Sequence, residues 1–76
     1  MSWHRPTAAE ITVRQGKCDA WNAAHPVGTA VEVQRDNGNI METTTRSEAL
    51  LLAYQPVIQV KGIPGCYLLD RVHPTP

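Results

Sequence analysis

Phenylalanine is absent from this chain of 76 residues, and tryptophan and tyrosine occur only twice each. The aromatic side chains available to a core are therefore Trp3, Trp21, Tyr54 and Tyr67. A domain of this size buries only about 60% of the surface that its unfolded chain exposes. We therefore expect one small domain with a marginal hydrophobic core.

Neither acidic nor basic residues accumulate anywhere in the chain. Seven basic and seven acidic residues give a formal net charge of zero, and no two of like sign are adjacent. A protein that coats DNA presents a basic stripe, and one drawn to anionic lipids presents a basic cluster. The composition therefore argues against nucleic acid and against a membrane surface as partners.

Segments that would direct the chain into a membrane are also missing. No apolar stretch reaches the roughly 18 residues that span a bilayer. The opening residues, MSWHRPTAAE, contain no apolar region of a signal peptide. We therefore expect a soluble, cytoplasmic protein.

Two cysteines and two histidines repeat one spacing. Cys18 precedes His25 by seven residues, Cys66 precedes His73 by seven, and both histidines precede a proline. Disulfides are rare in the cytosol, and paired zinc ligands in tight knuckles lie two to five residues apart. We predict neither a disulfide nor a metal site, although the sequence leaves open whether these four side chains come together.

Signatures of catalysis are absent. The chain has no GxSxG nucleophile elbow, no Cys-His protease signature and neither the GxGxxG nor the GxxxxGK[ST] phosphate loop. A chain of 76 residues also has little room to enclose a substrate. We therefore predict that the protein is not an enzyme and holds no cofactor.

The first third of the chain predicts an arm followed by a short helix. Residues 1–16 form the arm, with a possible strand at 10–16, and residues 17–76 form a single α+β domain. The alanine-rich segment 17–26 favours a helix. Asp19 would accept from its first-turn N–H groups, and Pro26 would end it.

The clearest local signal is a β-hairpin with the turn Asp-Asn-Gly at 36–38. A two-residue loop at 37–38 would place Val33 opposite Glu42. A three-residue loop at 36–38 instead places Val33 opposite Met41 and keeps the apolar side chains on one face. We therefore predict the three-residue loop, with its glycine in the left-handed conformation.

The remaining elements are a helix and a second hairpin. Segment 46–55 predicts a buried helix of about two turns with Ser47 as its N-cap, because its leucines cover most of a helical circumference. Segments 56–62 and 66–74 predict strands joined by a Pro-Gly turn at 64–65. The last strand would place Cys66, Leu68 and Val72 on one face and Tyr67, Leu69 and Arg71 on the other.

These elements predict an α+β fold. We expect a small, mostly antiparallel, four-stranded curled sheet with two short helices. The sheet would resemble an SH3-like or partly closed barrel.

One polar cluster coincides with the predicted start of the second helix. First-turn N–H groups and an arginine fork favour an anion there, whereas the alternative is ordinary capping beside a solvated arginine. Trp21 and its neighbour could likewise pack in the core or anchor a partner. The candidate ligand- or partner-binding residues are Thr44, Thr45, Arg46, Ser47, Trp21 and Asn22.

The segments WNAAHPVGT, RDNG, TTTRSEA, PVIQVKG and GCYLLDRV, between about residues 18 and 72, resemble a group of short phage and prophage proteins of unknown function. In that group a WNxxxPVGT segment precedes TRSxA and VxVxG. The resemblance implies a small accessory protein in the cytoplasm of a bacterial host. Such proteins often act by stoichiometric binding.

In this setting we predict a counter-defence protein. It would inhibit a host defence complex such as a CRISPR effector, or sequester an anionic signalling nucleotide as a homo-oligomer. One alternative is a nucleic-acid-binding SH3-like module that stacks bases on Trp21 or Tyr67 and contacts phosphates through Arg35, Arg46 and Arg71. Another is a structural or assembly protein whose sheet edge pairs with another chain.

Overall fold

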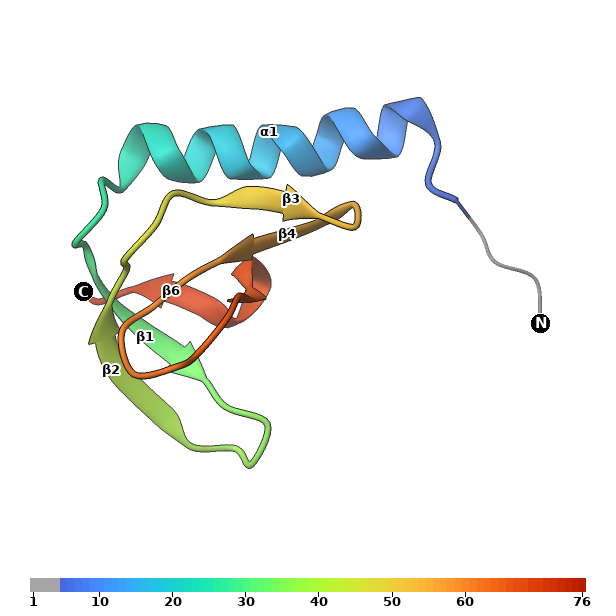
Figure 1. The fold of residues 1–76 in the computed structure, drawn as a ribbon. Coiled ribbons are helices and arrows are strands. Elements are labelled where there is room, and N and C mark those ends of the chain that lie inside the picture. Colours follow the sequence, from blue (N-terminus) through green and yellow to red (C-terminus); the bar gives the residue numbers. More distant parts are fainter. Residues whose placement is uncertain (1–4) are drawn as a thin grey trace.

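The computed structural model describes residues 5–76 and shows one long helix beside two small antiparallel sheets (Figure 1). One sheet has the strand order β2-β1-β6 and the other β3-β4-β5. The elements are α1 (Ala8–Ala24), β1 (Ala30–Gln34), β2 (Ile40–Thr44), β3 (Leu50–Leu52), β4 (Gln55–Ile58), β5 (Tyr67–Leu68), the 3₁₀ helix η1 (Leu69–Arg71) and β6 (Val72–Pro74).

The α+β class is confirmed, but the arrangement differs from the prediction. In the part of the chain from residue 5 onward there is one α-helix where two were expected, and six short strands form two sheets where four were expected in one. These sheets do not close into a barrel. An isolated antiparallel bridge between Thr45 and Val60 links the end of β2 to the segment after β4.

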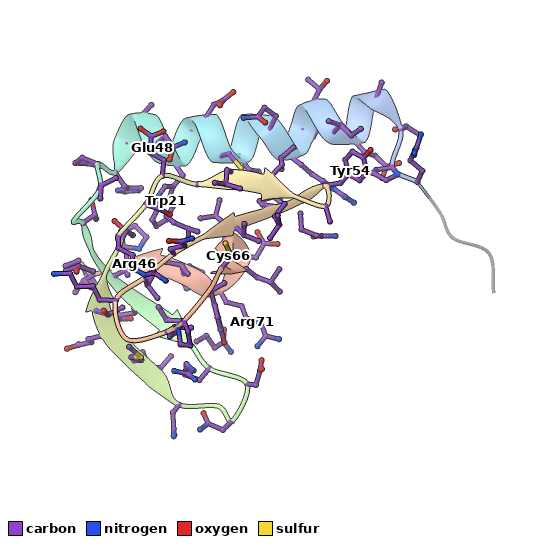
Figure 2. The ribbon with its side chains drawn as sticks, in the orientation of Figure 1. Trp21, Arg46, Glu48, Tyr54, Cys66 and Arg71 are labelled. Carbon is purple, nitrogen blue, oxygen red and sulfur yellow. The ribbon has the colours of Figure 1, made fainter. Side chains whose placement is uncertain are left out.

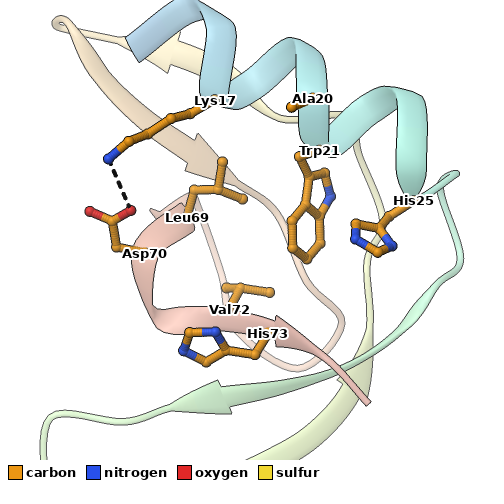
Figure 3. Close-up of a pocket in the computed structure, with 8 residues that line it drawn as sticks. All are labelled: Lys17, Ala20, Trp21, His25, Leu69, Asp70, Val72 and His73. Carbon is orange, nitrogen blue, oxygen red and sulfur yellow. Dashed lines mark ion pairs between the residues drawn. The ribbon is translucent and has the colours of Figure 1, made fainter. Parts of the chain in front are cut away.

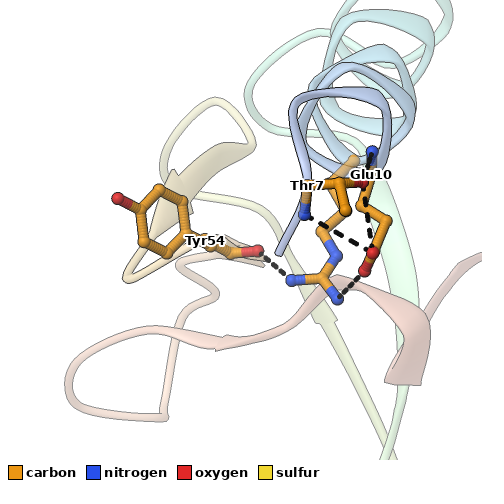
Figure 4. Close-up of polar contacts among 4 residues, drawn as sticks. Thr7, Glu10 and Tyr54 are labelled. Carbon is orange, nitrogen blue, oxygen red and sulfur yellow. Dashed lines mark hydrogen bonds and ion pairs between the residues drawn. The ribbon is translucent and has the colours of Figure 1, made fainter. Parts of the chain in front are cut away.

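Helix α1 replaces both the expected strand at 10–16 and the expected short helix at 17–26. Thr7 caps it in a capping box with Glu10 (Figure 4), and helix-forming residues outweigh the brief alternation of apolar residues. Asp19 therefore lies within the helix and is not its cap. The predicted end is confirmed, because α1 stops before Pro26 with His25 as its C-cap. Trp3 lies outside the described residues.

The predicted first hairpin is confirmed in register. Val33 lies opposite Met41, so the two-residue-loop alternative is excluded. The turn closes through a hydrogen bond of 3.0 Å from the N–H of Gly38 to the carbonyl of Arg35. Gly38 has φ +87°, the left-handed conformation that the prediction assigned to it.

The predicted helix at 46–55 is wrong, because this segment contains β3 and the turn into β4. The two turn residues, Ala53 and Tyr54, both have positive φ, 50° and 66°, as a two-residue hairpin turn of type I′ requires. Arg14 from α1 donates a hydrogen bond of 2.9 Å to the carbonyl of Tyr54 (Figure 4). Tertiary contacts thus override the helical propensity of the leucines.

The strand predicted at 66–74 is interrupted by η1, which changes the direction of the side chains. Leu69 and Val72 are both buried, although alternation had placed them on opposite faces. Leu68 is exposed, and so is Cys66. Gly65 has φ +74°, as the expected turn at 64–65 requires, but the connection is longer than predicted because β4 ends at Ile58, short of the strand expected at 56–62.

The core lies between α1 and the two sheets. Its buried side chains come from every layer: Cys18, Val31, Val33, Ala49, Ile58, Val60, Ile63, Leu69 and Val72. Trp21 and Tyr67 pack against this cluster while remaining partly exposed. Within residues 5–76, no helix combines the length and the apolar character needed to cross a bilayer.

Candidate functional site

Arg46, the residue that would have distinguished an anion site from a capping motif, is turned toward its own chain (Figure 2). Its Nε donates to the carbonyl of Val60 at 3.1 Å, and its Nη1 donates to Oε1 of Gln59 at 2.7 Å. Nη2 lies 3.3 Å from the carbonyl of Ile63 and 3.5 Å from that of Gly65. All three guanidinium nitrogens thus bind segment 59–65.

Thr45 is equally engaged in the fold. It is 2% exposed, and its hydroxyl and its carbonyl both accept from the N–H of Gly28, each at 3.0 Å. Its own N–H donates to the carbonyl of Thr29 at 3.0 Å. The residue therefore fixes the segment between α1 and β1 against the end of β2.

The two neighbouring candidates have structural contacts as well. The carbonyl of Thr44 accepts from the N–H of Lys61 at 3.0 Å. The hydroxyl of Ser47 accepts from the N–H of Gln59 at 3.0 Å, so it holds the residue that follows β4 and caps no helix. No helix begins at this cluster in the described chain, so the dipole argument for an anion no longer applies.

The side chain of Asn22 makes the hydrogen bonds to Ala49 that the backbone of a neighbouring strand would otherwise make. Its amide nitrogen donates to the carbonyl of Ala49 at 3.0 Å, and its amide oxygen accepts from the N–H of the same residue at 2.8 Å. This pair of bonds satisfies the backbone immediately before β3. The side chain therefore joins α1 to the sheet and is occupied within the molecule.

Trp21 differs from the other candidates, because it lines an open cleft between α1 and the segment η1–β6 (Figure 3). The cleft has a volume of about 440 Å³. The rings of Trp21 and His25 are 4.5 Å apart between centroids and inclined at 53°. The residues that line the cleft are Lys17, Ala20, Trp21, His25, Leu69, Asp70, Val72 and His73.

The cleft combines an apolar interior with a polar rim. Leu69 and Val72 belong to the buried core, and Trp21 packs against it. The two formally charged residues of the rim, Lys17 and Asp70, form an ion pair of 3.8 Å and offset each other. The C-terminal turn of α1 contains no basic residue, and the free carbonyls there disfavour an anion.

The four cysteine and histidine side chains do not come together. His25 and His73 both line the cleft, whereas Cys18 is buried in the core and Cys66 is exposed just before β5, beside Gln59. Burial, and secondarily the charge of Asp19, raise the pKa of the Cys18 thiol. Among residues 5–76 no group of three or more potential ligands has the geometry of a metal site.

Sequence reasoning thus named one residue of the cleft as a candidate, Trp21, and noted the proline-adjacent histidines only as possible metal ligands. Lys17 and Asp70 carried no local signal, because the cleft arises from packing between distant segments. No protein-family model matches the chain, and neither the search of curated proteins nor that of solved structures gives a match. The resemblance to short phage proteins therefore stays a prediction.

Proposed function

We propose that the protein acts by stoichiometric binding to another protein through the cleft at Trp21. The observation that carries the proposal is a partly exposed indole beside a neutral, largely apolar cleft. Tryptophan is enriched among the residues that dominate protein–protein binding energy, and such residues pair with pockets on the partner. In the setting that the resemblance implies, the partner is a host defence protein whose activity is blocked.

A protein partner fits the cleft better than an anionic nucleotide. Nucleotide binding needs donors or cations for the phosphates, but Lys17 is paired with Asp70 and the end of α1 presents carbonyl groups. Arg46, which motivated the nucleotide hypothesis, already donates to four acceptors. A cleft of about 440 Å³ can accept one apolar or aromatic side chain of a partner.

The test uses bacterial strains that each carry one defence system. We expect expression of the chain to restore phage infection in the strain whose system it blocks, and its purified target to form a complex of fixed stoichiometry with it. Lys17→Glu places a second carboxylate beside Asp70 at the rim, and we expect it to reduce both effects at least tenfold. Restoration in no strain would overturn the proposal.

Lys61→Glu is the matched control, because it makes the same charge change at an exposed residue outside the cleft. We expect this variant to behave as the unmodified chain does. Equal loss in both variants would mean that net charge, and not the cleft, determines binding. Thermal-shift measurements with cyclic di- and trinucleotides complete the test, since a saturable shift removed by Lys17→Glu would favour a nucleotide over a protein.

A further inference from the structure

The sheet β3-β4-β5 carries an apolar row on the side away from the core. Leu50 lies opposite Val57, which lies opposite Leu68, so the three side chains share one face across three strands. Leu50 is 45% exposed and Leu68 is 44% exposed. Leu52, in the next row of the same face, is 55% exposed.

Val57 shows that this row is a cluster of its own. It is only 6% exposed, yet it does not belong to the main core cluster. Leu50 and Leu68 flank it in the row. Antiparallel sheets usually present polar side chains on a solvent face, so leucines at these outward positions indicate a face that is covered in use.

The same face continues toward Cys66. Gln59 and Cys66 lie two residues beyond the Val57–Leu68 pair, and the amide nitrogen of Gln59 is 3.8 Å from the sulfur of Cys66. No residue of β3, β4 or β5 is charged. The three strands are therefore uncharged, and the nearest charge at this margin is that of Arg46, which donates to Gln59.

We infer that this face, defined by Leu50, Leu52, Val57 and Leu68, binds the same face of a second copy of the chain. A two-fold contact brings identical patches together, so a face that meets itself must not carry charges of one sign. The uncharged face of β3-β4-β5 meets this condition. The other sheet does not, because Glu32 and Glu42 lie opposite each other on its outer side.

Two of the four sheet edges, β3 and β6, are poorly suited to pairing with a strand of a second copy. The amide of Asn22 occupies the backbone groups of Ala49 at the start of β3. Pro74 in β6 has no N–H to donate to another strand. The dimer that we infer uses side chains of the leucine face, none of which lines the cleft at Trp21.

Sedimentation equilibrium on the full chain, at concentrations up to about 1 mM, tests the inference. We expect the mass to rise from that of the 8.4 kDa chain toward twice that value. Leu50→Lys and Leu68→Lys alter exposed side chains, and each should weaken association at least tenfold while leaving the circular dichroism spectrum unchanged. Ile40→Lys, at a 58%-exposed position of β2, is the matched control and should still dimerise.

A monomer at every concentration would overturn the inference, as would equal weakening by Ile40→Lys. Cross-linking with a short bismaleimide gives an independent readout. Cys66 is exposed and Cys18 is buried, so covalent dimers should form through Cys66 and disappear in Cys66→Ser. Undiminished cross-linking in Leu68→Lys would equally overturn the assignment to this face.

Discussion

Replacement of Arg46 by alanine should destabilise the fold and leave no anion-binding function to lose. The substitution removes the donors to Val60, Gln59, Ile63 and Gly65. Two of these bonds, to the carbonyls of Val60 and Ile63, are partly buried, and the other two are exposed. The stability effect should therefore come mainly from the partly buried pair.

The expected magnitude follows from those two bonds. A hydrogen bond contributes about 0.5–1.5 kcal/mol net and somewhat more when one partner is charged, so two give about 2–3 kcal/mol. For a domain of this size each kcal/mol shifts the melting temperature by about 4–8 °C. Arg46→Ala should therefore lower the melting temperature by roughly 10–20 °C.

Thermal and urea unfolding followed by circular dichroism measure this loss. Arg46→Lys keeps the charge but lacks the planar fork, so its melting temperature should fall between those of Arg46→Ala and the unmodified chain. Lys61→Ala, which removes an exposed cation from the same part of the molecule, should change stability by less than about 0.5 kcal/mol. Unchanged melting of Arg46→Ala would refute the structural role and restore the anion-site hypothesis.

Four further predictions concern stability and thiol chemistry. Asn22→Ala should lower the free energy of unfolding by about 1–3 kcal/mol in urea titrations, because it leaves a backbone N–H and a carbonyl without partners. Glu42→Lys should raise the free energy of unfolding by about 0.2–1 kcal/mol, because the like-charge pair of Glu32 and Glu42 becomes a pair of opposite charges. A decrease would contradict this reasoning. Cys66 should react rapidly with a thiol reagent at neutral pH, whereas Cys18 should react only on unfolding. Because burial raises the pKa of Cys18 above 9.0, the unfolded chain loses that proton first, and the stability that the group contributes below pH 9 should decline as the pH rises further.

Features encoded by adjacent residues could be predicted from the sequence. The first hairpin is an example, since its Asp-Asn-Gly turn and its alternating side chains together determine the register. The helix end before Pro26 is another, because proline restricts the residue that precedes it. Both depend on interactions within a few residues.

Features that depend on contacts between distant residues could not be predicted from the sequence. The leucines of β3 have high helical propensity and follow a plausible N-cap. Their conformation nevertheless depends on pairing with β4 and on the bonds between Asn22 and Ala49, which are 27 residues apart. The start of α1 was missed for a different reason. The capping box of Thr7 and Glu10 is a local signal for a helix, but the alternating apolar residues at 10–16 favoured a strand in the prediction.

The candidate site likewise combines a feature that the sequence indicates with features that depend on contacts between distant residues. Trp21 was a candidate because of its residue type alone. The pair of Lys17 and Asp70 joins residues more than 50 positions apart and becomes visible only when α1 packs over η1. Arg46 was singled out correctly as unusual, but its partners in segment 59–65 show a structural role that its sequence neighbours did not indicate.

The contact between Asn22 and Ala49 also has a consequence for the order of events during synthesis. An unpaired strand edge beside three consecutive leucines is a template for aggregation until something occupies it. A ribosome makes α1 before it makes β3, because the chain is produced from its N-terminus. The side chain that occupies the backbone groups at the start of this edge is therefore already present in the nascent chain when the strand emerges.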